Sequence, residues 1–413
     1  MRTLVRTRLG LVTLVAAAGL LAACGSGGST GSSPTTSPAS PQQPGTTATS
    51  TPGGGGVIVF NGQGNHLDAY DAEPPFAHQR VITNRAEDPQ GLDINGQICF
   101  FPDGSRRFIA GEDTDQKAGN TQGWGIFELT GDRVGELGAR QIGKLVPTFQ
   151  GSTDNAENYG CGVLSDGRIV TTDVGNQAAG PGDGQLIVWF PPFDSYQVAY
   201  CKVDVEIATA QSIWVDDQDR VLVASARPAA FGGQGAGVWR YHDLPTGPDA
   251  AGGCGRTDAT GAPLADQVRK ELFIASGEHD LIAPTGVAGG PDGHLFVSSV
   301  INGVINEYDA NGRYVRTVLR PPAGEQLGER PFSTGTPLGI AVGPDGTLYF
   351  ADIGLVIDPA DGIGPGDRTG SVRRIVFVGG VPQPPETMAG GLAFPDGIGL
   401  LVPGGGAGGA SRL

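Results

Sequence analysis

Short apolar runs separated by turn residues recur along most of this chain. Residues 284–297 form an apolar run, a Pro-Asp-Gly turn and a second apolar run, and residues 337–350 repeat the pattern position by position. Asp-Gly between two apolar runs is a strong signal for a β-hairpin. With weaker copies included, the pattern predicts hairpin turns at 102–104, 165–167, 217–219, 291–293, 344–346 and 395–397. Their spacing of roughly 50 to 75 residues is typical of propeller blades that carry loop insertions.

A second pair of strands is expected after each hairpin. Behind residues 284–297, an apolar run at 303–308 is followed by a turn at 309–312 and another run at 313–319. Four antiparallel strands in succession define one blade of a propeller. The sequence therefore predicts an all-β, six-bladed propeller of four-stranded antiparallel blades over residues 57–403.

The two ends of this region complement each other. Residues 57–72 match 295–310 without a gap, so the folded body begins in mid-blade, whereas the hairpin near Asp396 lacks its outer strands. The N- and C-terminal segments are therefore expected to share one blade, which closes the ring and leaves no free sheet edge at the junction. Whether residues 57–60 or 399–402 form the second strand of that blade is left open by the pattern.

Composition and charge narrow the class of protein. The chain has 413 residues, of which 70 are glycine and 31 are proline. Helices tolerate neither residue well, so this composition excludes a protein built of long helices. Its formal net charge is −16 and it has no basic cluster. Since phosphate contacts require Lys and Arg, we expect no nucleic-acid partner.

The N-terminus has the features of a bacterial lipoprotein signal. Three arginines, at positions 2, 6 and 8, precede an uncharged apolar run at 9–20, and Leu-Ala-Ala-Cys ends at Cys24. The segment resembles a lipobox, which implies a signal peptide over 1–23 and lipidation of Cys24; the alternative is an ordinary signal peptide cleaved after Ala23. Residues 24–56 are rich in Gly, Ser, Thr and Pro and are expected to form a flexible tether, and 404–413 a Gly-rich tail. The predicted location is extracytoplasmic, with a lipid anchor in the bacterial cell membrane.

Four further cysteines fit an oxidising compartment. Cys99 and Cys161 fall on the predicted first strands of neighbouring blades, and Cys201 and Cys254 on outer parts of the next two. An even number of cysteines in an exported domain suggests two disulfides, and we predict that they pair in this order. The alternative is buried free thiols, because cysteine is a common core residue.

Long loops are predicted on one face of the ring, around the mouth of the central channel. They span 112–122, 174–184, 227–235 and 354–368, and long Gly-rich loops in a tight repeat suggest a binding rim. Candidate ligand-binding residues on this rim are Glu112, Arg227, His279 and Asp352. Oxygen-bearing side chains suit Ca²⁺ or Mg²⁺; the candidate metal ligands are Glu157, Asn158, Asp113 and Asp173.

Residues 57–403 resemble NHL-repeat and gluconolactonase-like six-bladed propellers. The resemblance rests on one repeated pattern: Pro-x-Gly, then apolar-Ala-apolar, then x-Pro-Asp-Gly-x-Leu, then two apolar residues. For the gluconolactonase type, the resemblance implies a divalent ion in the channel. Its ligands would be an early Glu together with Asn and Asp at the second position of the motif that opens a first strand. The corresponding positions here are Gln90, Tyr159, Gln211, Thr285 and Leu338, none of which is Asn or Asp, and Asn158 is one place removed.

Three functions remain open at this point. The leading interpretation is an exported, lipid-anchored propeller that binds a small molecule or an envelope protein through its loop-rich channel face. The first alternative is a lactonase or esterase that uses a Ca²⁺-like ion to polarise an ester carbonyl. The second is a structural repeat that docks a neighbouring envelope protein through an apolar patch. A monomer is expected, because a closed ring needs no partner to be stable.

Overall fold

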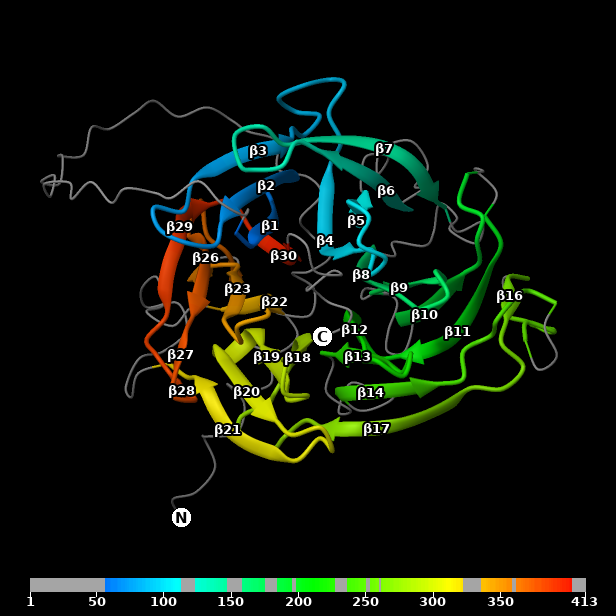
Figure 1. Ribbon diagram of the computed structural model, residues 1–413. Helices are drawn as coiled ribbons and strands as arrows, with labels where there is room; N and C mark the ends of the chain where they lie inside the picture. The colour runs from blue at the N-terminus through cyan, green and yellow to red at the C-terminus, as the bar shows by residue number, and fades with distance from the viewer. Residues whose placement is uncertain are drawn as a thin grey trace, which may run out of the picture.

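The computed structural model describes residues 56–112, 123–146, 158–174, 184–194, 198–226, 236–249, 253–259, 261–321, 336–358 and 362–402. These residues form a closed ring of six antiparallel sheets (Figure 1). We call the region at the centre of the ring, which the innermost strands face, the channel. The prediction of a six-bladed propeller with four-stranded blades is therefore confirmed, although one sheet carries two additional short strands.

The blades are numbered 1 to 6 around the ring, with strands given from the channel outward. Blade 1 contains β30 (Pro395–Leu401), β1 (Ile58–Gln63), β2 (His66–Asp71) and β3 (His78–Ile82). Blade 2 contains β4 (Ile94–Phe100), β5 (Arg107–Glu112), β6 (Gly123–Thr130) and β7 (Gly138–Leu145). Blade 3 contains β8 (Asn158–Val163), β9 (Ile169–Asp173), β10 (Gly184–Trp189) and β11 (Tyr200–Ile207).

The second half of the ring repeats this order. Blade 4 contains β12 (Ala210–Val215), β13 (Val221–Ser225), β14 (Gly237–His242) and β17 (Arg269–Ala275). Blade 5 contains β18 (Pro284–Gly289), β19 (Leu295–Ser299), β20 (Val304–Tyr308) and β21 (Tyr314–Leu319), with a short 3-10 helix, η2 (Val300–Asn302), between β19 and β20. Blade 6 contains β22 (Pro337–Val342), β23 (Leu348–Asp352), β26 (Gly370–Ile375) and β29 (Glu386–Leu392). Blade 6 also carries two small hairpins, β24 (Leu355–Asp358) with β25 (Gly362–Pro365), and β27 (Phe377–Val378) with β28 (Val381–Pro382).

The ring closes in blade 1, as the complementary ends of the sequence predicted. Strand β30 pairs antiparallel with β1, with Ile58 opposite Leu401, and in Figure 1 the red C-terminal strand lies beside the blue N-terminal strands. The N-terminal segment supplies the second strand of the blade and the C-terminal segment supplies the first. This arrangement answers the question that the sequence pattern left open.

The structure corrects two details of the predicted repeat. Pro395-Asp396-Gly397 is not a hairpin turn but the start of the innermost strand β30, and residues 390–392 end the outer strand β29. Gln90 is not at the start of a first strand either, because it lies in a turn closed by the Gly91 N–H to Asp88 carbonyl bond before β4 begins. The same tripeptide, Pro-Asp-Gly, can open a strand or make a turn, and the local pattern alone does not distinguish the two.

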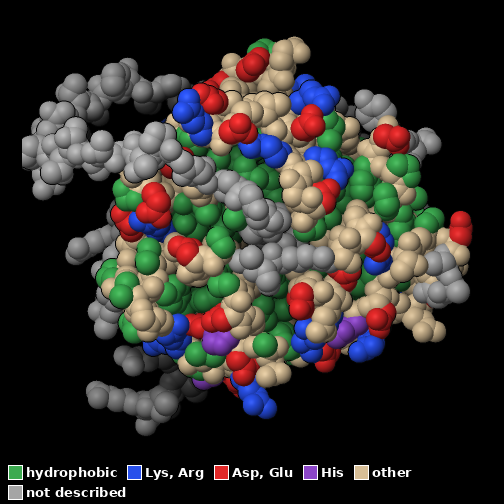
Figure 2. Space-filling model, viewed as in Figure 1, with side chains coloured by type: hydrophobic (Ala, Val, Ile, Leu, Met, Phe, Trp, Pro, Cys, Tyr) green, Lys and Arg blue, Asp and Glu red, His purple; other side chains and the backbone are tan. Residues whose placement is uncertain are grey.

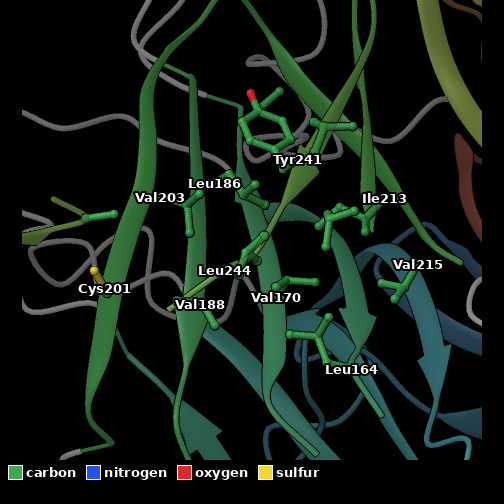
Figure 3. Close-up of a cluster of buried hydrophobic side chains, with 14 of the residues drawn as sticks. Leu164, Val170, Leu186, Val188, Cys201, Val203, Ile213, Val215, Tyr241 and Leu244 are labelled. Carbon is green, nitrogen blue, oxygen red and sulfur yellow. The ribbon is translucent and has the colours of Figure 1, made fainter. Parts of the chain in front are cut away.

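Apolar side chains fill the spaces between successive blades. Figure 3 shows one such cluster, in which side chains of blade 3, such as Leu186 and Val203, pack against Ile213, Val215 and Tyr241 of blade 4. Equivalent clusters lie at the other blade interfaces. Because each blade buries one face against each neighbour, the channel end of every first strand is held in a fixed place.

Two disulfides join neighbouring blades in the predicted pairing. Cys99 on β4 is bonded to Cys161 on β8, and Cys201 on β11 is bonded to Cys254, each with a Cα–Cα distance of 5.9 Å. Disulfides persist in oxidising compartments. The two bonds therefore indicate an extracytoplasmic environment for the folded body.

The second disulfide belongs to a strap that the sequence did not predict. The segment between β14 and β17 leaves blade 4 and adds β16 (Pro263–Leu264) and β15 (Arg256–Thr257) to the outer edge of blade 3. The buried Lys202 side chain forms an ion pair with Asp258 of the strap. Blades 3 and 4 are therefore tied at their outer edges as well as through their core.

The surface carries charges of both signs. On the face seen in Figure 2, Lys and Arg side chains lie among Asp and Glu side chains. Among the described residues, no helix has the length and apolar character that crossing a membrane requires.

Candidate functional site at the channel mouth

The two faces of the ring differ in what they carry. On one face of the ring, which we call the loop face, the first strand of each blade begins and the second strand ends. In blades 2 to 6 the first strands begin there with Ile94, Asn158, Ala210, Pro284 and Pro337. The hairpins between first and second strands lie on the opposite face, which we call the turn face. The long loops expected at 112–122, 174–184 and 227–235 belong to the loop face, but most of their residues lie outside the described part of the chain.

Unpartnered polar side chains gather on the loop face of blades 2, 3 and 4. Asn95 Oδ1, Asn158 Oδ1, both amide atoms of Gln211 and Ser225 Oγ are buried without a hydrogen-bond partner in the described structure. Asn158 is 1% exposed and Gln211 and Ser225 are 0% exposed. A buried polar group without a partner costs roughly 1–3 kcal/mol, so several of them in one region require an explanation.

The side chains of Asn95 and Asn158 both approach Gly111. A Cβ atom placed on Gly111 would lie 2.3 Å from Asn95 Oδ1 and 3.4 Å from Asn158 Nδ2, so only glycine leaves room for both amides. Asn158 Nδ2 donates a hydrogen bond to the Gly123 carbonyl, which fixes the orientation of the amide and leaves Oδ1 as the unpaired atom. The unpaired Oδ1 atoms of Asn95 and Asn158 therefore lie close to the same glycine near the channel mouth.

Two of the four predicted metal ligands come together here. Asn158 is the direct cross-strand partner of Asp173, and both side chains are buried. The other two, Asp113 and Glu157, lie outside the described residues. The predicted metal-ligand set therefore stays a prediction.

The predicted rim residues have structural partners. Glu112 accepts hydrogen bonds from Gln141 and Lys144 on the outermost strand of its own blade. The Asp352 carboxylate accepts bonds from the Thr336 and Gly354 backbone N–H groups. These contacts account for why both acids are buried.

His279 lies in the segment between β17 and β18. Its ring is exposed and stacked on Tyr314 with 3.6 Å between the ring centroids. The fourth rim candidate, Arg227, lies outside the described residues.

Asp396 is the functional-site candidate that the sequence interpretation missed. It follows Pro395 at the start of β30, which is the second position of a strand-opening motif. Asp396 Oδ2 accepts a hydrogen bond from the Gly96 N–H at 2.7 Å, and Oδ1 accepts one from the Gly397 N–H at 2.6 Å. Burial raises the pKa of this carboxyl to about 7, because the charged form loses its hydration while the backbone bonds compensate only in part.

Asn95 was missed for a related reason. The pattern placed the strand-opening position of blade 2 at Gln90, whereas β4 begins at Ile94 and puts Asn95 near its start. The signal that could have corrected both errors is glycine in the next position: Gly96 and Gly397 occupy the place of Gly286 and Gly339 in the clear repeats.

Apolar side chains cover the rest of the channel mouth. Tyr159, Leu338, Ile353 and Leu355 form one buried cluster with side chains of blades 3, 5 and 6. The Tyr159 hydroxyl donates to the Asp396 carbonyl at 3.4 Å. The mouth thus has an apolar side and an amide-lined side, the combination typical of small-molecule sites.

The described residues do not reproduce the metal cage of gluconolactonase-like propellers. Both oxygens of Asp396 accept backbone N–H bonds, and Tyr159 and Leu338 stand at two of the positions that would hold ligands. Among the residues that the structure describes, no three His, Cys, Asp or Glu side chains are grouped as a metal site would require.

Comparisons with known proteins identify the fold alone. No family model and no curated protein matches the chain. A crystal structure of a nidogen/laminin complex aligns at 11% identity over 84% of this chain and 98% of the matched chain, with a TM-score of 0.51. A luciferin-regenerating enzyme aligns at 13% identity over 80% and 88%, with a TM-score of 0.46, and virginiamycin B lyase from Staphylococcus aureus at 11% over 82% and 85%, with a TM-score of 0.43. The class defined here is that of the six-bladed β-propeller, which hosts binding proteins and enzymes alike.

Proposed function

We propose that this chain is an exported, lipid-anchored propeller that binds a ligand or partner through the loop face of its channel. The observation that carries the proposal is the group of buried, unpartnered polar atoms on Asn95, Asn158, Gln211 and Ser225. Native proteins rarely leave such groups unpaired, and where they do the usual reason is a ligand or ordered water.

The chemistry of these atoms favours a neutral ligand with both donors and acceptors. Amide and hydroxyl groups supply hydrogen bonds without formal charge. The neighbouring acid Glu112 already binds Lys144, so it offers little net charge to a ligand. The apolar side formed by Tyr159 and Leu338 suits a ligand with one hydrocarbon face.

The position of the chain ends supports an anchor on the opposite face. The Val57 carbonyl accepts a hydrogen bond from Ala72, and Ile58 pairs with Leu401, so the folded body begins and ends on the turn face. A tether attached there would leave the loop face directed away from the membrane. If residues 25–56 behave as their Gly, Ser, Thr and Pro content predicts, a tether of about 32 residues would span roughly 30 Å, enough to make this face accessible.

The metal-dependent lactonase has no support among the described residues. Two of its candidate ligands, Asp113 and Glu157, lie outside them. Because a lactonase of this type requires a divalent ion, its response to chelation distinguishes it from a binding propeller.

A thermal-shift panel tests the proposal. The full-length protein and its Gln211→Leu variant would be melted with glucose, N-acetylglucosamine, glucono-lactone and the dipeptide Ala-Ala as probes. A ligand that binds only the folded state raises the melting temperature. We expect at least one probe to do so in the wild type and in the control Asn311→Leu, whose side chain lies on the turn face, but not in Gln211→Leu. A rise that persists in Gln211→Leu would place binding elsewhere, and no rise with any probe would contradict a site for small neutral ligands.

A further inference from the structure

A cleft on the turn face lies between blades 4 and 5, away from the channel mouth. Its volume is about 270 Å³, and its walls include Trp214, Arg220, Arg240, Phe273, Gly289 and His294. All of its lining residues belong to the described part of the chain. No residue assigned above to the loop-face site lines it.

Trp214 is one of the residues that line this cleft. It is the fifth residue of β12 and is only 5% exposed. The edge of its indole faces Gly289, where a Cβ atom would lie 2.5–2.8 Å from Cζ2, Cε2 and Nε1. Glycine at 289 is therefore required for the indole to reach this position.

The Trp214 indole N–H is a donor without a partner. None of the hydrogen bonds formed by the described residues uses it, and it is not among the side-chain atoms sealed from solvent. Since Trp214 lines the cleft, its N–H is available to a ligand there.

Two arginines on the cleft wall keep unused donors. Arg220 binds Asp216 through Nε at 2.5 Å, which leaves both terminal nitrogens. Arg240 binds Glu271 through Nε and Nη2, and its guanidinium lies 3.9 Å from the centroid of the Phe273 ring, which leaves Nη1. A guanidinium presents its donors in a planar fork that matches a carboxylate.

Apolar surface lies beside these donors. Phe273, Leu222, Leu295 and the indole of Trp214 line the same cleft. Each arginine already has one acidic partner, so the site is not strongly positive and modest affinity is expected. Asp216 and Asp217 also line the cleft and reduce its positive charge further. The N–H groups of Arg220, Arg240 and Trp214 that these acids do not use, next to an apolar wall, suit an acceptor-only head on a hydrocarbon body.

We propose that this cleft binds a small organic acid, with its carboxylate between Arg220, Arg240 and the Trp214 N–H and its apolar body against Phe273 and Leu295. The proposal is independent of the loop-face site, because the two share no residue and lie on opposite faces.

Indole NMR signals provide a direct test. The chain has four tryptophans, so the full-length protein labelled with ¹⁵N-tryptophan gives four indole signals, and Trp214→Phe identifies one of them. Sodium benzoate is the probe, and benzyl alcohol is its neutral counterpart. We expect benzoate to shift the Trp214 signal saturably, to leave the buried Trp124 and Trp189 unchanged, and to bind at least tenfold more tightly than benzyl alcohol.

Arginine variants test the carboxylate contact. In the double variant that combines Arg220→Gln and Arg240→Gln, the affinity for benzoate should fall roughly tenfold or more. A loss of this size is expected when hydrogen bonds to a charged group are removed. The matched control is Arg140→Gln, which removes an exposed cross-strand pair with Glu128 in blade 2 and should leave binding unchanged. Unchanged Trp124 and Trp189 signals verify that each variant is folded. The proposal is overturned if benzoate leaves the Trp214 signal in place, if benzyl alcohol binds equally well, or if the arginine variants bind benzoate like the wild type.

Discussion

The Tyr159 hydroxyl donates a hydrogen bond to the backbone carbonyl of Asp396, although 237 positions separate the two residues in the sequence. Tyr159 opens blade 3 and Asp396 opens the strand that closes the ring, so the bond ties the closing strand to a blade that is not its neighbour. The same contact forms part of the apolar side of the channel mouth. Ring closure and the candidate site therefore depend on the same few residues.

Substitution of Tyr159 should separate packing from hydrogen bonding. Tyr159→Phe removes one long hydrogen bond and should lower the free energy of unfolding by about 1 kcal/mol or less. Tyr159→Ala leaves a cavity in a buried cluster and should cost about 3–5 kcal/mol. Urea denaturation of the two variants measures the difference. Equal losses would show that Tyr159 is not packed as described.

Asp396 should make stability fall as pH rises towards neutrality. Burial raises the pKa of its carboxyl from the ordinary 3.8 to about 7, so the folded state holds the proton more tightly than the unfolded chain does. The stabilisation is complete below about pH 4 and is lost as the pH rises to about 7, an effect of order 4 kcal/mol.

Urea denaturation at several pH values tests this dependence. Asp396→Asn removes the titrating group and should flatten the profile between pH 4 and 7, whereas Asp217→Asn, at an exposed turn, should not. The contribution of Asp396 is the difference between the wild-type and Asp396→Asn profiles. If that difference shows Asp396 adding stability as the pH rises from 4 to 7, the assigned burial of Asp396 is contradicted.

Reduction of the disulfides should destabilise the ring. Cys99–Cys161 and Cys201–Cys254 span 62 and 53 residues. On the chain-entropy model, loops of this size correspond to about 4 kcal/mol each. The expected result is a lower melting temperature with a reductant, and a similar loss in Cys201→Ala with Cys254→Ala. Mass spectrometry should find no free thiol at these four positions; free thiols in the unreduced, folded protein would refute the pairing.

Chelation should leave the protein unchanged if it is a binding scaffold. The described residues hold no metal cage, so EDTA and then Ca²⁺, Mg²⁺ or Zn²⁺ should not move the melting temperature. A saturable rise with one ion would instead support the lactonase and make Asp173→Ala and Glu157→Ala the next variants to assay on lactones.

Much of the fold could be predicted because it depends on local chemistry. Asp-Gly turns between apolar runs identified four of the hairpins, and the weaker Asp-Gln-Asp copy at 217–219 identified a fifth. The match of 57–72 to 295–310 identified the shared blade. Cys99 and Cys161 could be paired because neighbouring first strands lie side by side around a channel. Pro395-Asp396-Gly397 was misassigned because the same residues suit a turn and a strand start.

The site was harder to predict because it depends on what lies between blades. Gln211 appears in the sequence as an ordinary strand residue, and only the packing shows that its amide is buried without a partner. Asp396 has no sequence feature that announces a raised pKa, since the cause is burial by residues distant in the chain. The strap that carries Cys254 pairs with the outer edge of blade 3, and no local sequence pattern indicates that this edge accepts further strands.

The free energy of unfolding of Gln211→Leu, measured without ligand, tests the central claim most directly. If Gln211 is held in place for a ligand, its unpaired amide lowers the stability of the free protein. Leucine occupies a similar volume without polar atoms, so Gln211→Leu should raise the free energy of unfolding by about 1–2 kcal/mol. The same variant should lose the thermal shift that the sugar and dipeptide probes produce in the wild type. A loss of stability in Gln211→Leu would mean that the amide is satisfied within the fold, and it would contradict the assignment of the loop face as the binding site.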